Sequence, residues 1–386
     1  MKKTRNSRDA RNLVGLTPTP RRLCINGRFL TQLHTGIGQY TLGLLQHLAK
    51  IDQENEYLIV VPEKVDLRFG RNFKLRVLPE RKRVFSGFKK TWWEQIQLPD
   101  LCRNEAVDVA FFPYPSNPWF ASWYERKVRT VVTVHDCIPW MVKEYRPGIL
   151  SKMYNHQSRK AVAKADLVLT VSGTSLRDIV KVCGVPKERI EVVYNDVAEI
   201  YKEAPHPTFV KEVLGRFSLE AGKYFLYVGG YDLRKNVDGL LKEFENYSGD
   251  EPLVLAGGKV LGGGLYKSYD IKSLGSVVRT GFLAAEELAV LYRNCAAFVN
   301  LSTMEGFNLP IVEAANCGAP LVLSDIAVHR EVAEDAAVFV REGGLVAGLS
   351  RVLTEREKYV SAAKKLAKRY NWEKYAKLVK KFLTEK

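Results

Sequence analysis

Residues 302–314 read STMEGFNLPIVEA, with two glutamates eight residues apart and a glycine, an asparagine and a proline between them. We expect this stretch to form the end of a strand, a tight turn and the start of a helix. Pro310 suits the first helical turn, where its missing N–H costs nothing. Asn308 or Leu309 is expected to cap the helix, with the asparagine side chain able to bind a freed amide.

Such a helix start is also an anion site, because its free amides and the positive end of its dipole point at the ligand. Glu305, in the turn, can reach a sugar hydroxyl beside a bound diphosphate. Glu313, inside the helix, can accept both hydroxyls of a ribose. The stretch therefore indicates a nucleotide-sugar site. The alternative is an ordinary strand–helix connection whose two glutamates are solvated.

The flanking residues make the interpretation more specific. A short strand of buried type, 296–301, precedes the stretch. Cys317-Gly318-Ala319-Pro320 and His329-Arg330-Glu331-Val332 follow it, on either side of another short apolar strand. This arrangement resembles the donor-binding half of family 4 glycosyltransferases, whose signature is Glu, seven residues, Glu, then Cys-Gly-x-Pro and His-x-Glu-Val. The resemblance extends over nearly the whole chain from about Arg22, and 278–340 is its most specific part.

Length and charge set the outer limits. A chain of 386 residues is long enough for two domains with separate cores. Its formal charge of +16 implies attraction to an anionic partner: nucleic acid, acidic lipid or a charged substrate. No run of about 18 apolar residues occurs, so we expect no spanning helix. Residues 1–20 are basic without an apolar segment and are predicted to be a disordered arm rather than a secretory signal.

The six cysteines are scattered, and none forms a Cys-x-x-Cys pair or a Cys/His cluster typical of zinc. They predict reduced, buried thiols in a cytoplasmic protein.

Short apolar runs alternate with helical stretches along the whole chain, which predicts an α/β fold with parallel sheets covered on both faces. After a Pro-bearing stretch that ends near Thr208, the alternation starts again. Two doubly wound domains with ligand sites at their strand ends imply a cleft between them. The expected strands are 22–26, 57–61, 74–78, 108–112, 129–134, 166–171 and 190–196, then 224–230, 252–257, 277–280, 298–301 and 321–324.

The resemblance implies the GT-B architecture, two Rossmann-like domains facing a cleft. Residues 21–200 are predicted to be the acceptor-binding domain and 201–365 the nucleotide-sugar-binding domain. Residues 366–386 are predicted to be a helix that crosses back to the first domain.

Two adjacent cations follow an expected strand in Gly229-Gly230-Tyr231-Asp232-Leu233-Arg234-Lys235 and can clamp a diphosphate as it leaves. The family places an arginine directly after the strand glycine and a lysine five or six residues later. Lys235 matches that lysine, whereas Gly230 occupies the usual arginine position. We expect Arg234 to substitute for it; a solvated basic turn is the alternative.

Two sites in the first half are expected to face the same cleft. The glycines of Thr35-Gly36-Ile37-Gly38 let the backbone approach a ligand closely, although a simple turn is the alternative. His135 ends another strand, which is where ligands bind in such sheets. The resemblance implies that the glycine loop faces the donor phosphates and the acceptor. It also implies that His135 contacts the transferred sugar.

A basic and aromatic stretch, 89–99, contains Trp93, Glu94 and a following Leu-Pro. Cations beside aromatic rings suit an anionic interface. Similar helices occur in bacterial surface-polysaccharide members of the family. The resemblance implies that Glu94 lies on the acceptor side. A core tryptophan under a basic surface is the alternative.

Taken together, the resemblance implies retaining, metal-independent transfer of a hexose from a nucleoside diphosphate sugar, without a further cofactor. No Asp-x-Asp pair occurs for a metal ion. The expected catalytic residues are Glu305, His135, Lys235 and Arg234. The expected donor-binding residues are Gly36, Gly38, Gly229, Gly230, Gly306, Phe307, Asn308, Leu309 and Glu313.

GDP-mannose is the favoured donor and a lipid-linked or saccharide acceptor the expected partner, because the chain resembles bacterial mannosyltransferases. We expect a cytoplasmic protein, peripheral on the inner face of the membrane. Two alternatives stay open: a GT-B-fold nucleotide-sugar epimerase, and a non-catalytic basic module that binds membrane or nucleic acid. No RNA-binding motif is present, so we expect no nucleic-acid partner.

Overall fold

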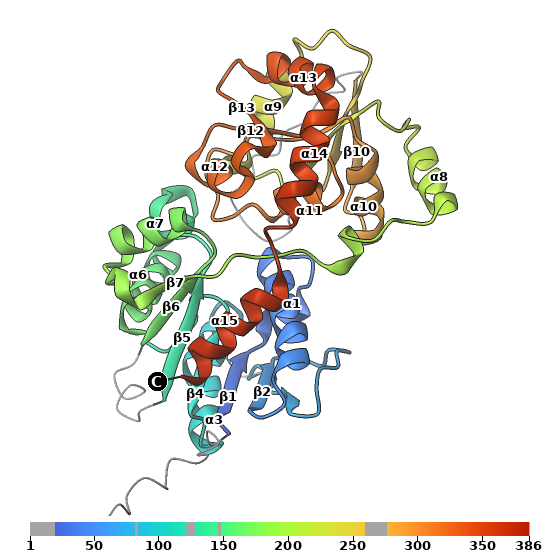
Figure 1. Cartoon of the computed structure of the whole chain (residues 1–386). Helices are drawn as coiled ribbons and strands as arrows, with labels where there is room; N and C mark the ends of the chain where they lie inside the picture. The colour runs from blue at the N-terminus through green and yellow to red at the C-terminus, as the bar shows by residue number, and fades with distance from the viewer. Residues whose placement is uncertain (1–19, 82–83, 120–127, 146–147, 259–275, 386) are drawn as a thin grey trace, which may run out of the picture.

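The computed structural model describes residues 20–81, 84–119, 128–145, 148–258 and 276–385. They form two α/β domains, one above the other in Figure 1, joined by an extended connection after residue 192. The predicted basic arm, 1–20, lies outside these residues except for its last position.

The N-terminal domain contains a parallel sheet of seven strands in the order β3-β2-β1-β4-β5-β6-β7. The strand order reverses beside β1, which places the ligand-binding edge of a doubly wound sheet at the carboxyl ends of β1 and β4. The strands are β1 Arg22–Asn26, β2 Glu56–Val61, β3 Phe73–Val77, β4 Val109–Phe112, β5 Arg129–Val134, β6 Leu167–Thr170 and β7 Ile190–Val192.

The C-terminal domain repeats this plan with six parallel strands in the order β10-β9-β8-β11-β12-β13. They are β8 Phe225–Val228, β9 Leu253–Ala256, β10 Val277–Gly281, β11 Ala297–Asn300, β12 Leu321–Ser324 and β13 Ala337–Val340. The α/β prediction with two doubly wound sheets is confirmed. Strand β13, a four-residue apolar run between two helices, was not predicted from the sequence.

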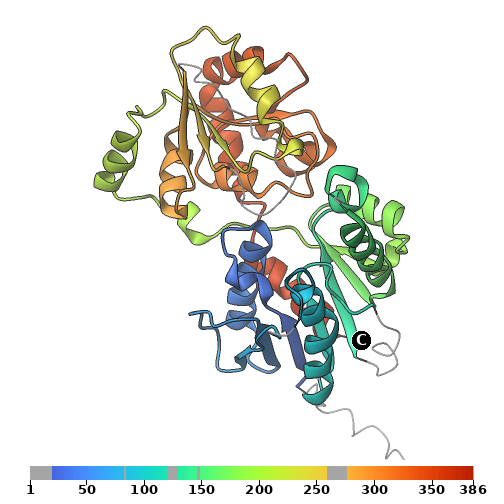
Figure 2. The same cartoon turned by 180° about the vertical axis from the view of Figure 1, so that it is seen from behind.

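Helices cover both sheets, as the views from the front and from behind show (Figures 1 and 2). Those of the N-terminal domain are α1 Gly36–Ile51, α2 Lys89–Trp92, α3 Leu98–Asn104, α5 Ile138–Met141, α6 Gly148–Lys164 and α7 Gly173–Cys183, with a π-helical turn at Trp93–Gln97. Then follow α8 Pro207–Arg216, α9 Val237–Phe244, α10 Ala285–Asn294, α11 Leu309–Asn316, α12 Ala327–Ala333, α13 Leu345–Thr354, α14 Arg356–Ala367 and α15 Trp372–Thr384.

The last helix returns to the first domain. In Figure 1, α15 lies beside α1 in the lower domain, whereas α14 lies in the upper domain. Trp372, at its start, fills the space above Gly43, where an added Cβ would lie 2.8 Å from the indole ring. The glycine in α1 therefore lets α15 dock against the N-terminal domain.

The structure also describes the cysteines, the start of α1 and the lengths of the helices. All six cysteines are free thiols, and five of them are buried. Helix α1 begins at Gly36, inside the expected glycine loop 35–38, because the Thr35 hydroxyl accepts from the Gly38 amide and caps the helix. Within the described ranges, every helix is too short or too polar to cross a membrane.

Candidate active site

The connection between β11 and α11 presents the predicted motif at the edge of the sheet. Asn308 is the N-cap of α11, and Pro310 lies in the first turn, as expected. Asn308 has a left-handed backbone (φ 70°), a conformation that asparagine tolerates better than most residues. Its side chain makes no capping bond, contrary to the sequence prediction. Its Nδ2 instead donates to Nε2 of His329, 2.8 Å away in α12. In the first turn of α11, Pro310 has no N–H and the Ile311 amide donates to the Asn308 carbonyl at 3.0 Å, so Leu309 is the helix residue whose amide can meet a ligand.

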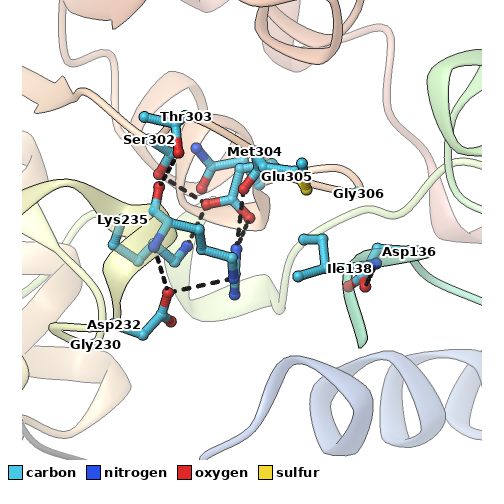
Figure 3. Close-up of polar contacts among 12 residues, drawn as sticks. Asp136, Ile138, Gly230, Asp232, Lys235, Ser302, Thr303, Met304, Glu305 and Gly306 are labelled. Atoms are coloured by element: carbon cyan, nitrogen blue, oxygen red, sulfur yellow. Dashed lines mark hydrogen bonds and ion pairs between the residues drawn. The ribbon is translucent and has the colours of Figure 1, made fainter. Parts of the chain in front are cut away.

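Glu305 lies at the centre of a charged cluster (Figure 3). Its Oε1 accepts from the Lys235 ammonium at 2.5 Å and from the Ser302 hydroxyl at 2.9 Å. Its Oε2 accepts from the Arg234 guanidinium. Arg234 is held in turn by Asp232, 3.4 Å from its Nε. The sequence-predicted Glu305, Lys235 and Arg234 therefore come together, although 70 residues separate the two segments.

This cluster sets the charge of Glu305. Burial alone would raise the pKa of the Glu305 carboxyl, but Lys235 and Arg234 outweigh burial and lower that pKa to about 2. Glu305 is thus ionised at every physiological pH. A carboxylate offers about four lone-pair sites, and Lys235, Ser302 and Arg234 use three. One site is left for a ligand hydroxyl, beside two cations that suit a diphosphate.

Glu313 lies one turn further into α11, in a different environment. The Tyr292 hydroxyl donates to its Oε2 at 2.9 Å. Burial raises the pKa of the Glu313 carboxyl to about 7, since the Tyr292 bond only partly opposes it. The residue borders a cavity of about 610 Å³ that both domains line, with Leu309 and Glu313 on one side and Gln39, Leu42 and Gly43 of α1 on another. The cavity is within the size range of small-molecule sites.

His135 ends β5 on the opposite domain. Its Nε2 donates to the Pro113 carbonyl at 2.8 Å, which leaves Nδ1 as the unprotonated nitrogen. Burial lowers the pKa of the imidazole to about 4, so His135 is neutral. Asp136, the next residue, has a raised pKa because of burial, which Arg234 partly offsets. Figure 3 shows Asp136 beside Gly306, across from the Glu305 cluster.

The two domains are in direct contact next to Glu305. An added Cβ at Gly306 would lie 2.1 Å from the His135 carbonyl oxygen, so only glycine allows this approach. The Ser172 hydroxyl donates to the Gly306 carbonyl at 2.6 Å. Tyr145 of the N-terminal domain donates to Asp232 at 2.8 Å, which braces Arg234 from across the cleft. The two domains therefore touch beside Glu305, at Gly306 and at Asp232.

Some of the glycines predicted to bind the donor are needed for the backbone conformation itself. A Cβ at Gly38 would lie 2.4 Å from the Gln32 carbonyl oxygen of the same loop, so this glycine is needed for the turn itself. Gly36 is open, with nothing within 4 Å of an added Cβ. Gly229 has a positive φ of 152°, and its carbonyl packs against Gly257. At Gly230 the carbonyl accepts from Tyr227 at 2.7 Å. Arg234, four residues later, donates to Glu305.

Three predicted residues have buried side chains. Phe307 packs in the core, with its ring 5.6 Å from that of Tyr370, so only its backbone can meet a ligand. Trp93 is a fully buried core residue. Glu94 is also fully buried, where it accepts from Tyr114 at 2.7 Å and from Tyr154 at 3.1 Å. The Lys90 ammonium lies 3.7 Å from the same carboxylate and is partly exposed, so Glu94 can influence an acceptor through these tyrosines and Lys90.

Several site residues escaped the sequence analysis. Asp232 and Ser302 lie inside the predicted motifs, and Asp136 directly follows His135, but the sequence pattern assigned no role to these three residues. Ser302 lies three residues before Glu305, a spacing that could have identified it. The cross-cleft contacts of Ser172 and Tyr145 had no local signal. In the part of the chain that the structure describes, no group of three His, Cys, Asp or Glu residues could hold a metal ion.

Comparisons with known proteins agree with this geometry. Residues 34–198 match Glycosyltransferase Family 4, and residues 216–386 match Glycosyl transferases group 1. The O-antigen chain mannosyltransferase B of Escherichia coli is 28% identical over 370 residues, which cover 88% of this chain and 93% of that protein. An N-acetylgalactosamine-N,N'-diacetylbacillosaminyl-diphospho-undecaprenol 4-alpha-N-acetylgalactosaminyltransferase of Campylobacter jejuni is 25% identical over 313 residues, 77% of this chain and 81% of that protein.

Among solved structures, HepE of Anabaena in complex with UDP and glucose superposes with a TM-score of 0.70. The match covers 95% of this chain and 100% of that one at 16% identity, so it speaks for the fold. Two Rossmann-like domains, the two matched families and a cation–carboxylate cluster at the cleft agree with one another. The chain therefore belongs to the family 4 glycosyltransferases of the GT-B fold and is a sugar-transferring enzyme.

Proposed function

We propose that this glycosyltransferase moves a hexose, with mannose favoured, from a nucleoside diphosphate sugar to a lipid-linked or polysaccharide acceptor. The observation that carries the proposal is the Glu305 cluster. Two cations bind one ionised carboxylate, which keeps a lone-pair site for a ligand and lies four residues before the first residue of α11. Cations and helix amides suit a diphosphate, and the carboxylate suits a hydroxyl of the sugar attached to it.

The residues divide the work by position. Lys235 and Arg234 stabilise the charge that develops on the departing phosphate, and the α11 amides at Asn308 and Leu309 bind phosphate or sugar. Glu305 orients the sugar. The free oxygen of Glu313 accepts the ribose hydroxyls. His135, neutral, offers hydrogen-bonding capacity to the oxocarbenium-like sugar from the other domain.

We infer a retaining reaction on one face of the sugar. The bond between C1 and the phosphate oxygen breaks, the acceptor oxygen bonds to C1 on the same face, and the acceptor proton passes to the departing phosphate oxygen. No protein nucleophile is needed in this scheme. Cations from the chain take the place of a divalent metal ion at the diphosphate.

Mannose from GDP-mannose is favoured because the Escherichia coli relative is named an O-antigen chain mannosyltransferase. A lipid-linked acceptor is supported by the diphospho-undecaprenol in the name of the Campylobacter jejuni relative.

A surface of the N-terminal domain suits an anionic membrane. Helix α6 exposes 82% of Ile149, 55% of Leu150 and 50% of Met153 at its start, with Lys152 among them. Residue Tyr154 of α6 contacts Glu94, so the basic 85–92 segment lies alongside, with Phe85 77% exposed. Apolar side chains among lysines, on a chain of net charge +16, fit the headgroup region of an acidic bilayer.

The test is a donor screen with purified protein, EDTA, each common UDP-, GDP-, dTDP- and ADP-sugar and an undecaprenyl-diphosphate-linked oligosaccharide. We expect nucleoside diphosphate release with one donor, strongest with GDP-mannose, and loss of release in Glu305→Ala. Conversion of the donor without an acceptor would identify an epimerase instead. No release and no thermal shift with any donor would count against the proposed function.

Membrane binding is tested separately. We expect Ile149→Asp with Leu150→Asp to weaken sedimentation with phosphatidylglycerol vesicles at low salt while donor-dependent thermal stabilisation stays unchanged. Equal sedimentation of wild type and variant would remove this surface from the proposal.

A further inference from the structure

The Glu331 carboxylate lies on the N-terminus of a helix that belongs to the other domain. Glu331 is in α12, and α7 begins at Gly173 in the N-terminal domain; the two helices are neighbours in Figure 1. The Gly173 amide donates to Oε1 at 2.5 Å, and the Thr174 amide donates to Oε2 at 2.9 Å. The Thr174 hydroxyl donates at 2.9 Å and the Tyr194 hydroxyl at 3.3 Å.

Local chemistry favours this contact. The first amides of a helix have no partner inside the helix, and its dipole is positive at that end, so a carboxylate is stabilised there. A Cβ at Gly173 would come within 3.3 Å of Glu331 Oε1, tighter than usual contact. The glycine at the start of α7 therefore leaves room for a carboxylate from the opposite domain.

The same turn of α7 holds the backbone beside Glu305. Ser172 accepts from the Ser175 amide at 3.0 Å and donates its hydroxyl to the Gly306 carbonyl at 2.6 Å. The Ser175 hydroxyl lies 3.0 Å from the His135 carbonyl and 3.2 Å from that of Gly306. The N-terminus of α7 thus contacts Glu331, Gly306 of the β11–α11 connection and His135.

Helix α12 makes the matching contacts in its own domain. His329, two residues before Glu331, binds the Asn308 side chain at 2.8 Å. The Glu331 carbonyl accepts from Arg369 at 2.9 Å, just before the crossing helix α15. One short helix therefore connects the donor loop, the N-terminal domain and the crossing segment.

We propose that Glu331 is a positioning residue: it holds the two domains together across the cleft and so aligns His135 of one domain with Glu305 of the other. The effect of Glu331 on kcat rests on the proposed function, whereas its effect on the domain arrangement does not. The domain arrangement can be measured without turnover, so a failure of this proposal can be told from a failure of the proposed function.

The first experiment measures domain closure by small-angle X-ray scattering of the full chain, alone and with GDP or UDP. Glu331→Ala is compared with wild type and with Glu342→Ala, which removes an exposed glutamate of the same domain. We expect a larger radius of gyration for Glu331→Ala only, with unchanged circular dichroism. Equal radii of all three proteins in every condition would overturn the proposal.

The second experiment separates positioning from a merely structural role, using the donor found in the screen. We expect Glu331→Ala to lower kcat about tenfold with a smaller change in donor KM, because the donor site itself stays intact. Glu331→Gln keeps one acceptor oxygen and should fall between wild type and Glu331→Ala. Thr174→Val removes only the hydroxyl contact and should cost less. Unchanged kcat in Glu331→Ala would overturn the proposal; an inactive wild type would instead count against the proposed function.

Discussion

The Lys235 ammonium donates to the Glu305 carboxylate at 2.5 Å, with both side chains almost fully buried. A buried ion pair of this kind is costly to break from one side, since the remaining charge loses its partner. Arg234 binds the other carboxylate oxygen and also lies 3.4 Å from Asp232, so two cations are paired with two carboxylates. A diphosphate that enters the cleft can form charge-assisted hydrogen bonds with these two cations.

The two glutamates of the motif should have different kinetic effects. We expect Glu305→Ala to lower kcat by about 100- to 1,000-fold, because it removes the group that orients the sugar at the reacting centre. Glu313→Ala should mainly raise the donor KM, since the ribose is remote from the bond that breaks. Steady-state kinetics of both variants with the same donor provides the measurement. Equal effects of both substitutions on kcat and KM would contradict these roles.

Donor binding should depend on pH through Glu313. Burial holds the pKa of its carboxyl at about 7, so the group is ionised above pH 7 and gains a proton below it. A protonated carboxyl loses acceptor capacity for the ribose hydroxyls, and donor KM should therefore rise as pH falls from 8 to 6. Glu305, with a pKa of about 2, contributes no ionisation in this range. The check is donor KM against pH for wild type and Glu313→Gln, whose profile should be flat; matching slopes would refute the assignment.

Gly306→Ala should open the cleft without unfolding either domain. The new methyl group would lie 2.1 Å from the His135 carbonyl oxygen, a clash that separation of the domains relieves. We expect about a 100-fold loss of kcat from misalignment, with a small change in melting temperature. Gly215→Ala, where nothing lies within 4 Å of the added carbon, is the matched control. A Gly306→Ala enzyme of normal activity would show that the closed contact is not needed.

The left-handed conformation of Asn308 predicts an unusual order of stabilities. Asn308→Ala should destabilise the protein by about 1 kcal/mol more than Asn308→Gly, because alanine is strained at a φ of 70° and glycine is not. Both variants lose the hydrogen bond to His329, so their difference isolates the backbone effect. Thermal unfolding followed by circular dichroism measures it. A glycine variant less stable than the alanine variant would argue against backbone strain.

Local sequence patterns predicted much of the fold. Strands β5 and β12 have the bounds expected from their apolar runs, since a strand buried on both faces is continuously apolar. Strand β13 was not predicted, because an apolar run of only four residues fits a buried helical turn as well as a strand. The predicted capping role of the Asn308 side chain was wrong, since its Nδ2 donates to His329, 21 residues away, and its Oδ1 accepts from no amide of α11.

By itself the sequence determined the chemical groups and where each stands on its strand or helix: two glutamates around a helix start, and an Arg-Lys pair after a strand. These depend on short-range spacing. Only the tertiary structure decided the charge states and the partners. Lys235 and Arg234 lower the pKa of Glu305 and so keep it ionised, whereas burial raises the pKa of Glu313 to about 7. Glu331 binds the start of a helix 157 residues away. The physical reason is that desolvation and ion pairing depend on which segments pack together in space, and that packing is not a property of any one segment.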